Sequence, residues 1–397
     1  MTLPLAGVRV LAVEQYGAGP FGTMFLADQG AEVIKIENPH DGGDMSRVAG
    51  PHFFAPGDAS SMYHALNRNK RSLTLDLSKP KGRAVLHDLV KSADAVANNL
   101  RGDVPEKLGL DYAQLKAHNP RIICAHLSAY GRKGPRKSWP GYDYLMQAET
   151  GYFSLTGEPD SLPTRCGLSI IDLMTGVAMA FGLVSALTAA RATGEGRDID
   201  VSLFDLALGN LNYLAAWYLN NGDAQARRPR SAHPTMTPCQ LFPTADGWIF
   251  LMCNKEKFWP ALCQALGQPG WADDPRFRTF PDRLENRDAV VALLDGALKE
   301  RTTAEWLADF AGVVPAAPVL DVAQALDNPF VTEHGRLHTV EHPDAGPFQL
   351  VAPAIRSAGD PPPANPAPPL GGDTDDILGG LGYNTSRIAS LRDDGVI

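Results

Sequence analysis

The sequence has 397 residues, of which 44% are hydrophobic and 20% are charged, and its formal net charge is −9. This is the composition of an ordinary globular protein with a core of normal size, and the length predicts more than one domain. The negative charge argues against nucleic acid and acidic membranes as partners, so an anionic ligand would need a local basic pocket.

The five cysteines are scattered along the chain, and no two of them form a C-x-x-C pair. This usage favours a reduced, cytoplasmic chain over a disulfide scaffold. The opening stretch MTLPLAGVRV lacks a basic region and a long apolar region, so we expect no secretion signal. The longest apolar stretch, 173–190, contains several hydroxyl and small residues, which predicts a buried helix rather than a membrane span.

The first 37 residues give the outline of a dinucleotide-binding fingerprint. The apolar run 8–13 predicts a strand, the glycine-rich stretch EQYGAGPFG follows it, and a second predicted strand at 31–36 ends next to Glu37. The glycines match G-x-G-x-x-G, with an acidic residue about 20 positions later. Two interpretations stay open. The glycines could let a helix N-terminus face a pyrophosphate, or they could only let strand, turn and helix pack closely.

Strand and helix patterns continue to alternate up to about residue 130. Further strands are predicted at 71–77, 93–99 and 121–130, and helices at 81–93 and 104–120. Alternation of this kind predicts an α/β protein with a parallel sheet and helices on both faces.

The next part of the chain has a different character. Residues 131–157 are rich in Gly, Pro and aromatic residues without a steady period, which predicts a long functional loop region. Two helices are then predicted at 173–192 and 201–220, separated by TGEGRDID.

Changes in composition mark a second, smaller domain at about 225–330. Within it, 247–253 resembles a strand, and 256–310 has a mainly helical pattern. A Pro-rich stretch at 359–373 predicts an extended linker that leads to a short helix around 374–381.

Metal and hydrolase motifs are missing from the sequence. No H-E-x-x-H pattern or tight His/Cys cluster occurs, and His334 and His338 have no third ligand nearby, so we expect no metal site. Neither a G-x-S-x-G elbow nor a Walker loop is present, which leaves triad hydrolases and phosphate-loop enzymes without support.

Asp172, in GLSIIDLMTG, is the sharpest candidate for chemistry because it directly precedes a predicted helix. One interpretation is a helix N-cap, for which Asp is a preferred residue. The other is an acyl nucleophile, because the positive helix end favours an ionised carboxylate and a partly desolvated carboxylate can attack an acyl group. The two interpretations do not exclude each other.

The loop before it carries Tyr142 and Asp143 in WPGYDYLMQ. The Tyr142 ring could serve packing, or its hydroxyl could face a substrate carbonyl. A basic group near these segments suits phosphates, although a solvated charged face is an equally good interpretation. This basic group consists of Arg101, Lys107, Arg132, Lys133, Arg136 and Lys137.

Together these stretches resemble the class III CoA-transferase family (the CaiB/BaiF family), which includes formyl-CoA transferase, carnitine CoA-transferase and the 2-methylacyl-CoA racemases. The similarity covers nearly the whole chain. It runs through AGPFGTMFLADQGAEVIKIE, GGDMSR, LNRNKRSLTLDL, GLDYAQLKAHNPRIICAHLSAYG, GYD, the Asp172 segment, TGEGRDIDVSLFDLAL and FPTADGWIFL. So many ordered blocks make the resemblance specific, unlike the glycine turn alone.

The resemblance implies an α/β fold with a Rossmann-like large domain, built on a parallel sheet, and a smaller α+β domain. We expect the large domain to span 1–224, the small domain 225–330, and a return segment 331–397 to complete the large domain. In this family two chains interlock as a homodimer, each threading the hole in the other.

The resemblance also implies an activity: CoA moves from an acyl-CoA donor to a free carboxylic acid. Asp172 matches the family nucleophile, which passes through an aspartyl anhydride and an aspartyl-CoA thioester. No separate cofactor, metal or nicotinamide is required, because the coenzyme A thioester is itself the substrate. The positions that match CoA and substrate contacts are Gly17, Ala18, Asn38, Leu75, Ser78, Asn99, Leu100, Arg101, Lys107, Trp139, Tyr142 and Asp143.

Several departures from the family bear on function. Lys107 replaces an Arg of the formyl branch, and Asn38 replaces a basic residue. Family racemases carry a His where this chain has Tyr142, and Tyr is a much weaker base at neutral pH, so transfer is favoured over racemisation. The formyl branch has bulkier residues at Gly17 and Ala49, and its glycine-rich loop is absent. The VEQ opening is closer to members that handle succinate, mesaconate or citramalate.

Two other functions remain as alternatives to transfer. One is the 2-methylacyl-CoA racemase, which would move the proton α to the thioester carbonyl. The other is a Rossmann-type NAD-dependent enzyme or a non-catalytic binder of nucleotide or CoA.

Overall fold

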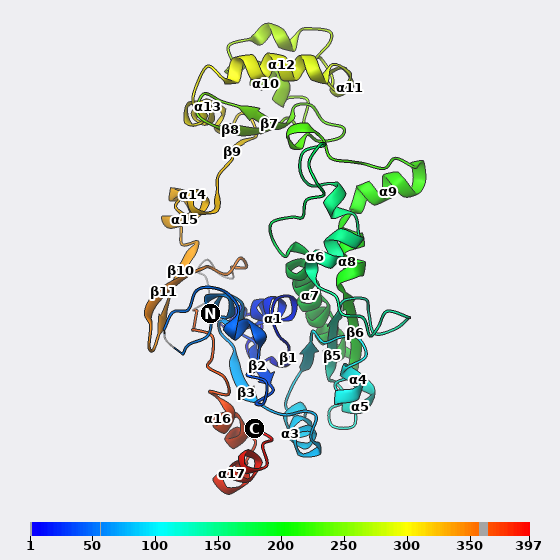
Figure 1. Ribbon diagram of the computed structural model, residues 1–397, viewed down its shortest axis with the longest axis vertical. Helices are drawn as coiled ribbons and strands as arrows, with labels where there is room; N and C mark the ends of the chain where they lie inside the picture. Colours follow the sequence, from blue (N-terminus) through cyan, green and yellow to red (C-terminus); the bar gives the residue numbers. More distant parts are fainter. Residues whose placement is uncertain (1, 56, 357–363) are drawn as a thin grey trace. The chain divides into compact units, whose positions relative to one another are not determined.

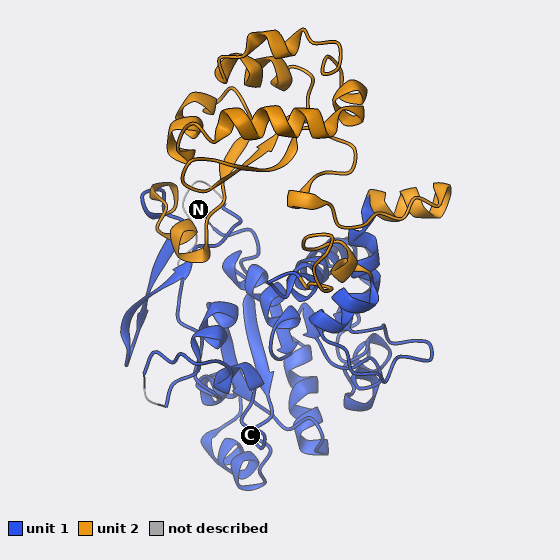
Figure 2. Cartoon of the chain, turned by 45° about the horizontal axis from the view of Figure 1, so that its top comes forward, with its two compact units in different colours: residues 1–150, 166–212, 332–397 blue, residues 151–165, 213–331 orange. Residues whose placement is uncertain are grey.

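The computed structural model describes residues 2–55, 57–356 and 364–397 of the chain (Figure 1). These residues form two compact units (Figure 2). The large unit contains residues 1–150, 166–212 and 332–397, and the small unit contains 151–165 and 213–331. The small unit therefore includes 151–165, which the expected division left in the large domain.

Six parallel strands form the sheet of the large unit, in the order β3-β2-β1-β4-β5-β6. The strands are β1 (Arg9–Val13), β2 (Glu32–Glu37), β3 (Arg71–Thr74), β4 (Ala95–Asn98), β5 (Ile123–Ser128) and β6 (Arg197–Ser202). This is the order of the doubly wound Rossmann sheet, which reverses between β1 and β4 and binds ligands beyond the carboxyl ends of its strands. The prediction of a parallel α/β sheet is confirmed.

Strand β6 corrects the expectation that TGEGRDID only separates two helices. Gly196 lets the chain pass directly against β5, because a Cβ at this residue would lie 1.9 Å from the Ile122 carbonyl oxygen. The strand then pairs with the whole of β5. Its Asp, Ile and Val residues alternate, which is the pattern of a half-exposed edge strand rather than of a loop.

Helices cover both faces of this sheet. They are α1 (Ala18–Asp28), α2 (Ser61–Asn67), α3 (Pro80–Val90), α4 (Pro105–Leu108), α5 (Tyr112–Leu115), α6 (Asp143–Glu149), α7 (Ile170–Thr193) and α8 (Leu203–Asn210), with the short 3-10 helix η1 (Met45–Val48). Helices α1 and α7 pack closely through Gly22 and Gly176. A Cβ on either glycine would lie 2.3 Å from a backbone oxygen of the other helix.

Two predicted helices are each broken in the structure. The stretch 104–120 forms α4 and α5, because Gly109 ends α4 with a left-handed φ of 76° and the Asp111 side chain caps α5. The stretch 201–220 forms α8 and α9 (Asn212–Asn221), which are separated at Asn212, where φ is 45°.

Helix α7 is, within the described residues, the one helix long and apolar enough to cross a membrane, and half of its most apolar stretch is buried. It packs against α1, β5 and β6 in the large unit. The sequence predicted this segment as a buried helix, and the packing places it in the core of the large unit.

The C-terminal part of the chain adds a hairpin and two helices to the large unit. These elements are β10 (Leu337–His342), β11 (Gly346–Val351), α16 (Thr374–Gly380) and α17 (Thr385–Asp393). Leu378 and Ile388 belong to the same core as Leu73 and Leu86. Part of the predicted Pro-rich linker, 359–363, lies outside the described residues. In the described part of the linker, the Pro368 carbonyl accepts hydrogen bonds from Arg47 and from the Tyr63 hydroxyl.

The small unit has a three-stranded antiparallel sheet in the order β7-β8-β9. Its elements are η2 (Tyr152–Ser154), η3 (Pro229–Ser231), β7 (Cys239–Pro243), β8 (Trp248–Met252), α10 (Phe258–Ala265), η4 (Pro269–Ala272), α11 (Phe280–Glu285), α12 (Arg287–Leu298), α13 (Thr303–Phe310), β9 (Ala316–Pro318) and α14 (Val322–Leu326), with most of α9 and of α15 (Pro329–Thr332). Trp259, Phe277 and Phe310 are buried in its core. The predicted strand at 247–253 and the mainly helical 256–310 are confirmed.

Candidate active site

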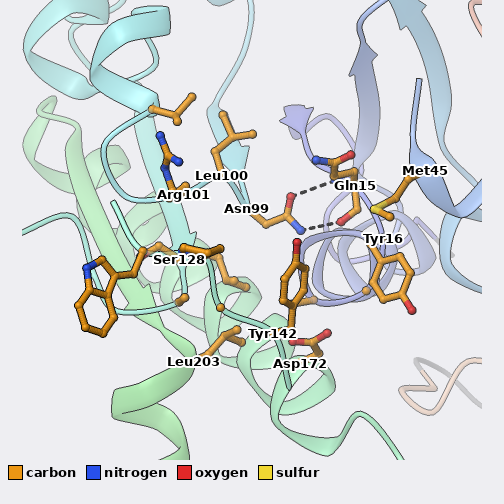
Figure 3. Close-up of a pocket in the computed structure, with 18 residues that line it drawn as sticks. Gln15, Tyr16, Met45, Asn99, Leu100, Arg101, Ser128, Tyr142, Asp172 and Leu203 are labelled. Carbon is orange, nitrogen blue, oxygen red and sulfur yellow. Dashed lines mark hydrogen bonds between the residues drawn. The ribbon is translucent and has the colours of Figure 1, made fainter. Parts of the chain in front are cut away.

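A pocket of about 390 Å³ lies beyond the carboxyl ends of β1, β4, β5 and β6 in the large unit (Figure 3). The residues that follow these strands supply much of its wall, as the topology of the sheet requires. The lining residues are Gln15, Tyr16, Gly17, Ala18, Met45, Asn99, Leu100, Arg101, Val104, Leu127, Ser128, Ala129, Trp139, Pro140, Gly141, Tyr142, Asp172 and Leu203.

The side chain of Asp172 does not cap helix α7, so the N-cap interpretation is wrong. Ser169 occupies the cap position, and its side chain makes no capping bond. Asp143 takes over this task, because its Oδ2 accepts the backbone N–H groups of Ile171 at 2.7 Å and of Asp172 at 3.0 Å. Gln147 in turn donates to the other Asp143 oxygen at 2.5 Å. The Asp172 carboxylate is therefore left available to the pocket.

The Asp172 carboxylate is held in an unusual electrostatic state. Its residue is only 8% exposed, and the carboxylate accepts no hydrogen bond from any described residue. Burial, with a further contribution from the negative charge of Asp143, raises the pKa of Asp172 to about 7. The helix end was expected to keep this group ionised. Burial and Asp143 oppose that effect, because both disfavour the charged form of the carboxylate.

Gly17 explains how the glycine turn meets this carboxylate. A Cβ at Gly17 would lie 2.9 Å from Asp172 Oδ2, so the first glycine of the fingerprint makes room for a side chain of the protein itself. A pyrophosphate at this helix N-terminus would face a carboxylate of the same sign. The negative group at the start of α1 is therefore supplied by the chain.

Glu37, the acidic residue of the fingerprint, is already bound by other groups of the protein. The Glu37 carboxylate accepts hydrogen bonds from Arg47 at 2.7 and 2.9 Å, from Ser72 Oγ at 2.7 Å and from the Asp44 N–H at 3.0 Å. Burial alone would raise the pKa of Glu37, but these partners and Lys35 lower it. With its oxygens saturated, Glu37 has no capacity left for a ribose diol. Both parts of the fingerprint therefore favour the packing interpretation.

A second pocket of about 240 Å³ adjoins the first in the large unit, because Gln15 and Leu100 line both. Gln15 is fixed there by Asn99, since its N–H donates to Asn99 Oδ1 at 2.9 Å and its carbonyl accepts from Asn99 Nδ2 at 2.7 Å (Figure 3). The second pocket is lined by Val13, Glu14, Gln15, Ile36, Glu37, Asn38, Asp41, Gly43, Asp44, Leu75, Asp76, Leu77, Ser78, Leu100 and Leu108.

The residues predicted for the site are thus divided between two pockets. Gly17, Ala18, Asn99, Leu100, Arg101, Trp139, Tyr142 and Asp172 line the first, and Asn38, Leu75, Ser78 and again Leu100 line the second. Lys107 and Asp143 line neither pocket. Lys107 is exposed and pairs with Asp103 at 2.5 Å, and Asp143 is buried beneath α7.

The predicted basic group is partly neutralised by acidic neighbours. Arg101 and Lys107 share the Asp103 carboxylate, and Arg132 pairs with Asp200 at 2.5 Å. Arg136 pairs with Glu149 and also lies over the Trp139 ring, 4.8 Å from its centroid. Within the described residues, no ion pair holds Lys133 or Lys137. The Lys137 backbone is packed against Gly102, beside Arg101.

Sequence reasoning missed several residues of the first pocket. The missed residues include Gln15, Tyr16, Met45, Val104, Leu127, Ser128, Ala129 and Leu203. Ser128 ends β5 and Leu203 follows β6 directly, so the rule that ligands bind beyond the carboxyl ends of parallel strands could have found them.

One group in the described part of the chain has the composition of a metal site: Asp58, His64 and His342. Asp58 Oδ2 lies 3.0 Å from His64 Nε2 and 3.4 Å from His342 Nε2. His342 Nδ1 accepts N–H groups from Asp344 and Ala345, which places the ring proton on Nε2, facing the carboxylate. A metal at this group would have to displace that proton, while the buried His64 Nδ1 has no hydrogen-bond partner among the described residues.

Comparison with known proteins gives a consistent picture. A model of CoA-transferase family III matches residues 5–374. Acetyl-CoA:oxalate CoA-transferase of Acetobacter aceti is 40% identical over 82% of this chain and 83% of its own length. Succinate–glutarate CoA-transferase of Agrobacterium fabrum is 35% identical over 89% and 88%. The solved structure of a CAIB/BAIF family protein from Brucella suis aligns with a TM-score of 0.80 at 33% identity, over 96% of this chain and 100% of that one.

Proposed function

Because this chain belongs to CoA-transferase family III, and is thus a CoA-transferase, we propose that it moves CoA between carboxylic acids through covalent intermediates on Asp172. The observation that carries this proposal is the state of the Asp172 carboxylate. It faces a pocket of about 390 Å³, is free of hydrogen bonds to any described residue and has a pKa near neutrality. Such a carboxylate can act as an acyl nucleophile.

In the first half of the proposed reaction, an Asp172 oxygen attacks the thioester carbonyl of the donor. The C–S bond breaks, the CoA thiolate leaves and an acyl-aspartyl anhydride forms. The thiolate then attacks the aspartyl carbonyl and releases the donor acid as a carboxylate, which leaves an aspartyl-CoA thioester. In the second half the acceptor carboxylate attacks that thioester, and the same two steps run in reverse. One thioester replaces another, so no ATP, metal or nicotinamide is required.

The surroundings of Asp172 favour these steps. Desolvation raises the free energy of the charged carboxylate, and this cost disappears when the carboxylate becomes a neutral anhydride. The first turns of α1 and α7 meet at this carboxylate, so their positive ends can stabilise the oxyanions of the tetrahedral intermediates. Gly17 leaves the space that the reacting carbonyl needs.

We assign the two adjoining pockets to the two ends of the CoA molecule. The thioester and pantetheine arm would occupy the first pocket, and the adenine nucleotide the second, past Gln15 and Leu100. Arg101 lines the first pocket, and the Lys137 backbone packs against Gly102, the residue after Arg101. We assign these two cations to the phosphate oxygens of CoA.

For the acids, we propose short dicarboxylates. The names of the two relatives above contain oxalate, succinate and glutarate, which are all dicarboxylic acids. Gly17 and Ala49 stand where the formyl branch has larger residues, which supports an acid larger than formate.

We also propose that the chain acts as an interlocked homodimer in the cytoplasm. Helices α7 and α8 of the large unit expose apolar side chains, with Val177 42%, Phe181 75% and Leu208 42% accessible. An apolar face of this kind on a core helix is typical of a protein interface. A second copy of the chain is the occupant that the family resemblance implies.

The test is acyl exchange with labelled CoA, using a panel of acyl-CoA donors against mono- and dicarboxylic acids and mass spectrometry as the readout. We expect Asp172→Asn to fold and to lose exchange, and hydroxylamine added during turnover to modify Asp172 alone. Exchange at the wild-type rate in Asp172→Asn would overturn the mechanism. Deuterium uptake at Cα of 2-methylacyl-CoA without an acceptor acid would indicate the racemase, and a thermal shift with NAD but not CoA would indicate a nucleotide-binding enzyme of another class.

A further inference from the structure

The GGDMSR block of the sequence has no role in the chemistry proposed above, yet it contacts the turn that carries Gly17. Gly42 and Gly43 both have left-handed backbone, with φ of 82° and 78°. This turn delivers Asp44 to the start of η1, where its side chain is buried. Asp44 Oδ1 accepts the backbone N–H of Tyr16 at 2.8 Å, and it also accepts the N–H and hydroxyl of Ser46, each at 2.8 Å.

The second Asp44 oxygen is held by Lys35, whose side chain is completely buried. Lys35 Nζ lies 2.7 Å from Asp44 Oδ2 and donates to the Glu14 carbonyl at 3.0 Å. Burial alone would raise the pKa of Asp44, but the Lys35 ammonium and the N–H donors outweigh it and lower the pKa. A buried ion pair contributes little net stability, so we interpret this pair as a contact that orients Asp44. Through this pair, Lys35 binds the Glu14 carbonyl and Asp44 binds the Tyr16 N–H.

Tyr16 has a strained backbone conformation that these two hydrogen bonds would maintain. Its φ is 65°, a left-handed value that is strained for an aromatic residue. Strain of this kind persists only where the surroundings impose it. Asn99 holds the preceding residue, Gln15, through two hydrogen bonds, so Tyr16 is clamped on both sides. The residue that follows is Gly17, where an added Cβ would lie 2.9 Å from Asp172 Oδ2.

We propose that Asp44, oriented by Lys35, is a positioning residue that holds Tyr16 in its left-handed conformation and so fixes Gly17 against the Asp172 carboxylate. This inference rests on the proposed function, because the position of Gly17 matters for turnover only if Asp172 reacts. Without the Asp44 acceptor, Tyr16 relaxes toward negative φ, and the turn shifts relative to Asp172. A misplacement of about 1 Å near a reacting group can lower a rate by about a hundredfold.

Two double variants separate the effect of the Asp44 hydrogen bond to the Tyr16 N–H, which we call the clamp, from the effect of losing buried charge. Lys35→Met with Asp44→Asn removes both charges but keeps an oxygen that can accept the Tyr16 N–H. Lys35→Met with Asp44→Ala removes the same charges and also the acceptor. We call these variants the Asn pair and the Ala pair. We expect kcat for acyl exchange to be at least about tenfold lower in the Ala pair than in the Asn pair. The KM values for acyl-CoA should lie within about twofold of each other.

A rescue variant tests whether the effect passes through Tyr16. Glycine adopts left-handed backbone without steric cost, so Tyr16→Gly should need no clamp. We expect the kcat difference between the Asn and Ala pairs to fall below about twofold once Tyr16→Gly is added to both. A difference that stays near tenfold would show that Asp44 acts in another way and would overturn the proposal.

Amide hydrogen exchange read by mass spectrometry measures the clamp without any turnover. We expect residues 14–19 to exchange about tenfold or more faster in the Ala pair than in the Asn pair, while peptides from the small unit exchange equally in both. Equal exchange at 14–19 would overturn the inference even if the enzyme is active. A wild-type protein that shows no acyl exchange with any donor would instead overturn the proposed function, and the exchange of 14–19 would still decide whether Asp44 clamps Tyr16.

Discussion

Replacing Asp172 by Asn should stabilise the protein, and the gain should grow with pH. The native pKa of Asp172 is about 7, against 3.8 for a free aspartate. The native state therefore binds more protons than the unfolded state between these two values, and stability falls as pH rises through that range. An Asn side chain does not titrate, so residue 172 no longer lowers the unfolding free energy of this variant as the pH rises.

The expected size follows from the two pKa values. With one pKa unit equal to about 1.36 kcal/mol, the wild-type protein loses about 2–3 kcal/mol of unfolding free energy between pH 5 and pH 8 through this group alone. The loss levels off above pH 8, where the native carboxylate is fully charged. The gap between the Asn variant and the wild type should therefore widen by about 2–3 kcal/mol over the same interval.

The measurement is urea unfolding of both proteins at half-unit steps from pH 5 to pH 8.5. Asp393→Asn, an exposed carboxylate on α17, is the matched control, and its gap in unfolding free energy to the wild type should stay constant over this pH range. A gap for Asp172→Asn that is constant or shrinks toward high pH would refute the reasoning. It would mean that burial and Asp143 do not destabilise the charged form.

Three further predictions concern the site and its surroundings. Asp143→Asn keeps an oxygen for the α7 N–H groups but removes a negative charge, so the rising limb of the kcat/KM profile for acyl exchange should move to lower pH; an unmoved limb contradicts the assigned cause. Gly17→Ala should lower kcat by about tenfold or more while Gly209→Ala, whose Cβ meets nothing, leaves it unchanged. Phe181→Glu should prevent assembly of the proposed homodimer, so the variant should show the mass of one chain in light scattering; a mass equal to that of the wild type would show that assembly does not need this face.

The sequence predicted those elements whose signal is local. Strands β1, β4 and β5 stood out because their runs are mainly apolar and buried, as parallel strands are. Strand β6 was not predicted because it alternates Asp with Ile and Val instead of forming an apolar run. The break between α4 and α5 was also missed, since Gly109 ends a helix only through its left-handed backbone, which a helical pattern does not reveal.

The site residues also divide into those with a local sequence signal and those whose role depends on contacts with distant parts of the chain. Asp172 was found because an acid at the start of an apolar helix is conspicuous in the sequence. Asp143 accepts a hydrogen bond from the Asp172 N–H, 29 positions away, and Asp44 accepts one from the Tyr16 N–H, 28 positions away. No local sequence pattern encodes such pairs. The raised pKa of Asp172 likewise depends on burial and on Asp143 together, and neither can be read from the residues next to it in the sequence.

The glycine turn shows why a fingerprint does not fix a function. In a dinucleotide-binding enzyme the first helix offers its positive end to a pyrophosphate, and the glycines keep that space empty. Here the third glycine lets α7 pack against α1, and this packing brings Asp172 into the space next to Gly17. Once a carboxylate occupies the helix end, a phosphate is repelled, whereas the mechanism that we propose turns this carboxylate into a neutral anhydride, which burial favours. Under that proposal, the same backbone serves group transfer because a neighbouring helix supplies the anion.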